Sequence, residues 1–137
     1  MWWIYALLSA VFAALTAIFA KVGIQGVNSD LATAIRTVVI LILAWGIAYF
    51  RGGVNSIHLL TQRNLFFLVL SGIATGLSWI FYFKALQMGK VSQVAPVDKL
   101  SVAIAIVLSV VFLGEVLTIK AAIGACLIIA GTLVLIL

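Results

Sequence analysis

The chain has 137 residues, of which 66% are hydrophobic and only 8% charged, and its net charge is +5. Soluble domains average about 45–50% apolar and about 25% charged residues, so too few charges are present here to cover a compact globule. Disorder requires low hydrophobicity and is excluded as well. The basic residues form no cluster, which argues against nucleic acid as a partner. The composition therefore predicts a chain whose main solvent is lipid.

Five segments are long and apolar enough to cross a bilayer, which takes about 20 residues in a helix. In chain order they cover residues 2–20, 31–50, 64–83, 94–114 and 119–137. Runs such as residues 38–48 are apolar on every side, whereas the strands of a membrane barrel alternate apolar and polar residues. The expected fold is an all-α membrane protein, with five transmembrane helices in one domain over residues 1–137. The first segment lacks a basic start and is expected to stay as a span, not to be removed as a signal peptide.

An odd number of spans places the two termini on opposite sides of the membrane. Side A, which holds the N-terminus, carries Arg51, Arg63 and Lys120 in or beside its connections, and side B carries Lys21, Lys84 and Lys90. Basic residues normally set the orientation of a membrane protein, and here the connections balance. Arg36 and Lys99, just inside spans, tilt the count towards side B. One orientation could still win on this weak bias, but balanced connections favour insertion in both orientations.

Ionisable residues inside spans are costly and are therefore candidates for function. Arg36 lies in the second span, where it either extends its guanidinium to the interface or lines a cavity as a cation. Asp98 and Lys99 follow Pro96, which suits the first turn of a helix, so Asp98 either stabilises that helix start or joins a polar cluster on side B. Glu115 follows the helix-ending Gly114 and either pairs with a nearby base or acts as a gate. Arg36, Asp98, Lys99 and Glu115 are thus the gate or coupling candidates.

The third span combines hydroxyl groups, glycines and aromatic rings. Gly72 and Gly76 form a GxxxG pattern, which permits close helix contact, and Gly124 and Gly131 in the fifth span are read in the same way. Trp79 and Tyr82 are three residues apart, so they share a helix face and either form an interfacial belt or line a site for an organic substrate. The substrate-cavity candidates are Ser9, Ser71, Thr75, Trp79 and Tyr82.

No catalytic pattern accompanies these residues. His58 is the single histidine and lies in a connection, the three acidic residues are dispersed, and Cys126 is the single cysteine. We expect neither an enzyme nor a metal site or cofactor.

Several motifs resemble the EamA domain of the drug/metabolite transporter superfamily. They are Phe83-Lys84-Ala85-Leu86, Gly89, Ser92, Pro96, Phe112-Leu113-Gly114-Glu115, Ile123-Gly124-Ala125, Ile128 and Ala130-Gly131, preceded by Trp3, Leu7-Leu8-Ser9-Ala10 and Arg36. Members of that family typically carry two five-helix repeats in inverted orientation, and this chain resembles one repeat. It is also similar in plan to the small multidrug resistance branch, but the first span lacks that branch's acidic residue.

The resemblance implies a secondary transporter in the cell (inner) membrane. A lone repeat with balanced charge could restore the inverted pair as an antiparallel homodimer and work by alternating access on small organic metabolites or amphipathic compounds. The alternatives are a non-transporting membrane subunit, or half of a lipid-carrier flippase that needs a partner chain. The expected partners are the lipid bilayer, a second copy and the substrate.

Overall fold

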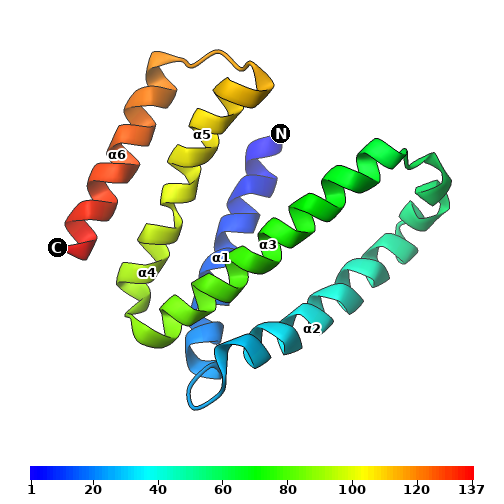
Figure 1. Ribbon diagram of the computed structural model, residues 1–137, viewed down its shortest axis with the longest axis horizontal. Helices are drawn as coiled ribbons and strands as arrows, with labels where there is room; N and C mark the ends of the chain where they lie inside the picture. The colour runs from blue at the N-terminus through cyan, green and yellow to red at the C-terminus, as the bar shows by residue number, and fades with distance from the viewer. The chain divides into compact units, whose positions relative to one another are not determined.

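All five predicted spans are helical in the computed structural model, which describes residues 1–137. Helices α1 (Trp2–Gly23), α2 (Ser29–Phe50), α3 (Gln62–Met88) and α6 (Ile119–Ile136) correspond to four of them, and α4 (Val91–Asp98) with α5 (Leu100–Leu113) makes the fourth in chain order (Figure 1). A short 3₁₀-helix, η1 (Gly53–Leu59), lies in the second connection. The structure confirms an all-α protein with five helices able to span a membrane.

Side chains cap three of these helices and so fix where they begin. Asn28 Oδ1 accepts hydrogen bonds from the N–H groups of Asp30 (2.8 Å) and Leu31 (3.2 Å) at the start of α2. Thr61 and Thr118 do the same for α3 and α6, each accepting from a backbone N–H three residues on. These oxygens satisfy donors that the first turn of a helix leaves without an intrahelical partner.

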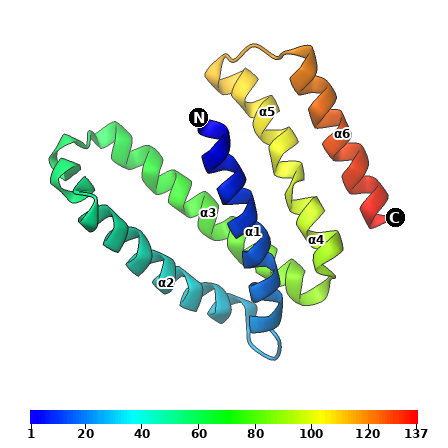
Figure 2. The ribbon, with the colours of Figure 1, turned by 180° about the vertical axis from the view of Figure 1, so that it is seen from behind.

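The chain divides into two compact units. The terminal unit holds residues 1–19 and 88–137, and the central unit holds residues 20–87. Within the terminal unit α5 and α6 lie side by side, and α4 also contacts α6 (Figures 1 and 2). Within the central unit α2 and α3 are joined through η1, which contacts α2.

The best-buried part of the central unit is the corner where the end of α1, the start of α2 and the end of α3 meet. Ala20, Ile24, Ser29, Thr33, Phe83 and Leu86 are all buried there. Gln87 Nε2 donates to the carbonyl oxygens of Ile24 (3.3 Å) and Val27 (2.6 Å), and Lys21 Nζ donates to that of Leu86. Because carbonyl groups at the ends of helices lack intrahelical partners, these contacts satisfy one carbonyl at the end of α3 and two in the connection after α1, and they hold the corner together.

Candidate functional site

Arg36 is held against aromatic rings inside the central unit. Its guanidinium carbon lies 4.2 Å from the ring centroid of Phe83 and 5.3 Å from that of Trp79. These two residues are four apart on α3, so their rings share one face of that helix. Arg36 itself lies seven residues after Ser29, about two turns into α2. The geometry is a cation–π stack within the span.

The N–H groups at the edge of this guanidinium lack a full set of hydrogen-bond acceptors, although its face is covered by rings. Nη1 is buried and has no hydrogen-bond partner. Ring faces attract the positive charge but do not replace the oxygen acceptors that the in-plane N–H groups need. Asp30 is the sole acidic residue of the central unit; it is exposed and lies six residues before Arg36 on another face of α2. The site is therefore electropositive and has donor capacity to spare.

Small and hydroxylated side chains extend this site along α3. Ser71, Thr75, Trp79 and Phe83 recur at intervals of four, which places them on one stripe of the helix. The Thr75 hydroxyl donates to the Ser71 carbonyl oxygen at 2.8 Å. A Cβ added at Gly72 or Gly76, beside this stripe, would meet no atom within 4 Å. The stripe is thus open and mildly polar beside the cation.

The other predicted cavity residues lie differently. Tyr82 contacts the ring of Phe83 edge to face, with 5.6 Å between centroids. Phe83 contacts the Arg36 guanidinium together with Trp79. The sequence did not single out Phe83 as a site residue, although its spacing of four residues from Trp79 places both rings on one face of α3. Ser9 is exposed on the part of α1 that belongs to the terminal unit, and its place in a cavity stays a prediction.

Asp98 and Lys99 mark a break in the fourth span. Asp98 ends α4, Lys99 precedes α5, and their side chains pair at 3.2 Å. The expectation that Pro96 occupies a first turn is wrong, because α4 begins at Val91 and Pro96 lies inside it. A proline there removes the hydrogen bond to the Ser92 carbonyl oxygen and crowds that turn, and the helix is interrupted at Lys99, three residues further on. The proposed cluster with Arg36 and Lys84 stays a prediction, since those two residues belong to the central unit.

Asp30 and Glu115, the two other acidic residues, both lie at helix ends. Asn28 is the cap of α2, and Asp30 lies in the first turn of that helix, where the helix dipole favours a carboxylate. Glu115 is exposed and forms no ion pair with Lys120; its backbone N–H donates to the Ser109 carbonyl oxygen at 3.3 Å and helps to close α5. Gly114 ends that helix as expected, with a left-handed φ of 67°.

The glycines expected to pack helices closely have no neighbour where a side chain would project. A Cβ at Gly124 or Gly131, as at Gly72 and Gly76, would meet nothing within 4 Å. Within each unit these positions therefore leave room for another helix or for lipid, and their role in helix packing stays a prediction.

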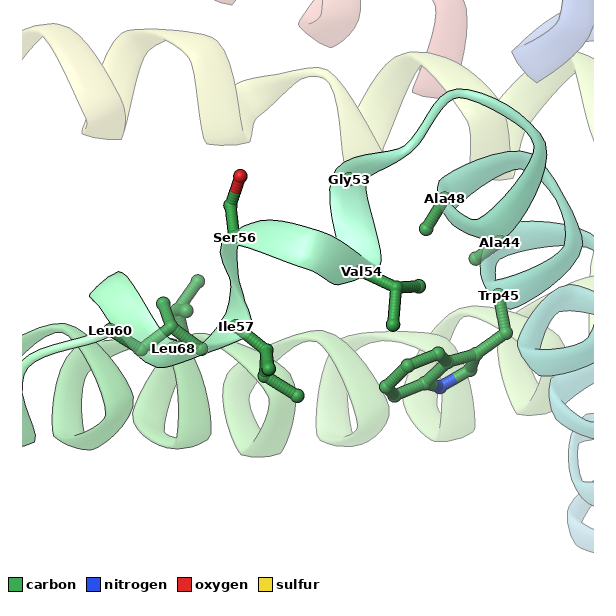
Figure 3. A pocket seen from close by; sticks show the side chains of 9 residues that line it. All are labelled: Ala44, Trp45, Ala48, Gly53, Val54, Ser56, Ile57, Leu60 and Leu68. Atoms are coloured by element: carbon green, nitrogen blue, oxygen red, sulfur yellow. The ribbon is translucent and has the colours of Figure 1, made fainter.

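A separate apolar groove lies at the η1 end of the central unit. The groove is open and has a volume of about 730 Å³. It is lined by Ala44, Trp45, Ala48, Gly53, Val54, Ser56, Ile57, Leu60 and Leu68. Figure 3 shows the Trp45 ring beside Val54 and Ile57. No charged side chain lines this groove, and its polar side-chain groups are the Ser56 hydroxyl and the Trp45 indole N–H, so it offers mainly van der Waals contact. None of the predicted site residues lies here.

Comparison with known proteins identifies the family of the chain. The model of the EamA-like transporter family matches residues 1–137. A Sinorhizobium sp protein, named as an uncharacterised transporter in the cobO 3′ region, is 49% identical over 134 residues, which are 98% of this chain and 95% of that protein. An uncharacterised protein of Methanocaldococcus jannaschii is 33% identical over 81 residues, 59% of each chain. No solved structure matches the chain.

These findings point to a transporter and not to an enzyme. The family match runs from the first residue to the last, and the structure supplies five helices long and apolar enough to cross a membrane. The chain is a multi-pass membrane protein and belongs to the EamA-like transporter family.

Proposed function

We propose that the chain is a half-size secondary transporter that works as an antiparallel homodimer in the cell (inner) membrane. It moves small organic metabolites or amphipathic compounds by exposing one site alternately to the two sides. The observation that carries this proposal is the charged Arg36 within a span, stacked on Trp79 and Phe83 beside an open face of α3. A charge kept inside a span at such cost marks a functional path more often than a structural one.

The odd number of spans in the chain supports the homodimer. One chain supplies five spans, and an odd number inverts the second half when two repeats follow each other. Two copies inserted in opposite orientations reproduce that arrangement without a linker. In each membrane-spanning stretch at most 11% of the residues are buried, so lipid or another chain has to cover the rest.

The residues are assigned to roles on these grounds. Ser71, Thr75, Trp79 and Tyr82 on α3, with Ser9 on α1, are the proposed substrate contacts. Asp98 and Lys99 lie where the fourth span is interrupted, and such interruptions provide points at which a helix can bend. They are the proposed gate or coupling residues together with Arg36, while Glu115 is a candidate gate on side A.

Flux measured in liposomes tests the proposal. The purified chain is screened for compounds that raise its melting temperature, and each stabilising compound is then tested for uptake with and without an imposed pH gradient. We expect a stable ten-helix dimer and uptake above that of protein-free liposomes. A chain that remains a monomer and transports nothing until a partner is added would contradict the proposal. That result would favour a non-transporting subunit, or half of a lipid-carrier flippase.

A further inference from the structure

The edge of the Arg36 guanidinium has unfilled hydrogen-bonding capacity in the central unit. A guanidinium presents five N–H donors in one plane and stays charged at any pH a protein experiences. Phe83 and Trp79 occupy its face at 4.2 Å and 5.3 Å, and Nη1 is buried without an acceptor. A buried charged donor without an acceptor is destabilising, so the arrangement favours any ligand that brings oxygen atoms to that edge.

The sign of the charge decides which ligands fit. Asp30 is the one carboxylate in the central unit, and it is exposed on another face of α2. A cationic ligand would therefore meet Arg36 with no carboxylate of the central unit beside it to offset the repulsion. A carboxylate or phosphate group matches the guanidinium fork, because two of its oxygens can each accept from one N–H in the same plane.

The surroundings of the cation indicate the rest of the ligand. The stripe from Trp79 to Ser71 offers an aromatic ring and then small side chains, and no atom lies within 4 Å of the positions where Gly72 and Gly76 would carry a Cβ. The Thr75 hydroxyl already donates to the Ser71 carbonyl oxygen, so this surface has few free donors for a polar body. An apolar or aromatic body fits it better than a sugar does.

We propose that Arg36 is the anion-binding residue of the transport site, and that it takes the carboxylate or phosphate of an amphipathic substrate whose apolar body lies along α3 over Trp79 and Thr75. This inference rests on the proposed transport function and adds the chemical class of the substrate. The same chemistry belongs to a free organic anion and to the phosphate of a lipid headgroup, so the test has one arm for each source.

The test compares ligands that share a body and differ in charge. For the free anions, benzoate is compared with neutral benzamide and cationic benzylamine, and phenyl phosphate with benzyl alcohol. For the lipid arm, dihexanoyl phosphatidic acid is compared with dihexanoylglycerol, which has the same acyl chains and lacks the phosphate. Binding to the purified dimer is followed by thermal shift and by titration at constant ionic strength. We expect the anion of at least one set to bind at least tenfold more tightly than its uncharged counterpart, and benzylamine not to bind.

Variants assign the preference to Arg36. Arg36→Gln is expected to abolish the tenfold difference while leaving the weak binding of the neutral compound unchanged. Arg36→Lys keeps the charge without the fork and should retain only part of the difference. Arg63→Gln is the matched control, because Arg63 is exposed in the first turn of α3 and lies outside the stack.

Three results would overturn the inference. They are equal binding of anions and their neutral counterparts, an anion preference that survives in Arg36→Gln, and an equal loss in Arg63→Gln, which would indicate general attraction by a basic protein. If Arg36→Gln does not fold, the wild-type ligand pairs and Arg36→Lys still decide the question. Uptake that occurs without an anion preference contradicts this inference alone, whereas anion binding through Arg36 without any uptake contradicts the transport function alone.

Discussion

Single residues at helix ends determine where the spans of this protein stop. Gly114 adopts φ 67° and its N–H, with that of Glu115, donates to the Ser109 carbonyl oxygen. These two hydrogen bonds turn the chain back onto the last turns of α5, as glycines at helix ends commonly do. The conformation is open to glycine because a Cβ in the left-handed region clashes with the backbone.

Gly114→Ala should therefore lower the stability of the chain by about 1–2 kcal/mol. The reduction is measured as a fall in melting temperature in detergent. Gly46→Ala is the control, because Gly46 lies within α2 and a Cβ there would meet nothing within 4 Å. That control should be neutral or slightly stabilising. Equal losses in the two variants would show that the left-handed turn does not matter.

Asp98 is the acidic residue proposed for coupling, and its contacts make it suitable for a clean substitution. Its partner Lys99 is 57% exposed and Asp98 is 33% exposed, and exposed pairs contribute about 0–1 kcal/mol. Asp98→Asn should thus keep the dimer while reducing proton-driven uptake more than Asp30→Asn does. Uptake measured in liposomes with and without a pH gradient checks this. Gradient-driven uptake that persists in Asp98→Asn would remove Asp98 as the coupling group, and loss of the folded dimer would assign it a structural role.

At the scale of elements, α4 is tied to α6 by one buried hydroxyl. Thr132 is 3% exposed, and its Oγ1 lies 3.2 Å from the Pro96 carbonyl oxygen and 2.8 Å from that of Ile128. Pro96 is where α4 loses a helical hydrogen bond, so this contact supports the helix at its weakest turn. The tie links the interruption at Lys99 to the last span within the terminal unit.

Thr132→Val keeps the shape of this side chain and removes the donor. We expect a loss of about 0.5–1.5 kcal/mol, the range typical of one intramolecular hydrogen bond in a protein. Thr16→Val is a matched control, since the Thr16 hydroxyl donates to the Phe12 carbonyl oxygen of its own helix at 2.8 Å. The difference between the two melting temperatures isolates the contact between α4 and α6. No difference would mean that the Pro96 contact contributes nothing.

At the scale of the whole molecule, orientation depends on the balance of basic residues. The connections carry three on each side, so reporters fused at the C-terminus should detect both sides of the membrane in comparable amounts. Removing Arg63 or Lys90, which belong to opposite sides, should shift the ratio in opposite directions. A reporter signal confined to one side in the unmodified chain would contradict dual topology.

Assembly is the second question at this scale. In a single copy, a Cβ at Gly72 or Gly76 would meet no atom within 4 Å, so Gly72→Leu and Gly76→Leu should act between copies and lower the dimer fraction. Gly46→Leu, at an equally open position of α2, is the control. Dimer fractions measured by cross-linking compare the three variants. An unchanged dimer in both α3 variants would place those glycines against lipid.

Much of the candidate site could be found from the sequence, but its arrangement could not. Arg36 stood out because a cation inside a span is costly, and Trp79 because it shares a helix face with Tyr82. That the Phe83 ring faces the guanidinium together with the Trp79 ring depends on how α2 and α3 are rotated about their axes. Hydropathy does not report this rotation when helices are apolar on all sides. The same limit explains why the groove beside η1 was not predicted.

The sequence by itself determined the membrane setting and the number of spans, because bilayer thickness and backbone hydrogen bonding leave a long apolar segment few options other than a helix. The order and spacing of its motifs indicated the family by resemblance. Tertiary structure decided the rest. It placed Pro96 inside α4 and held Arg36 on two rings with Nη1 unpaired. The stack and the buried corner depend on contacts between residues far apart in the chain, and each contact is set by the geometry of neighbouring helices and not by local composition.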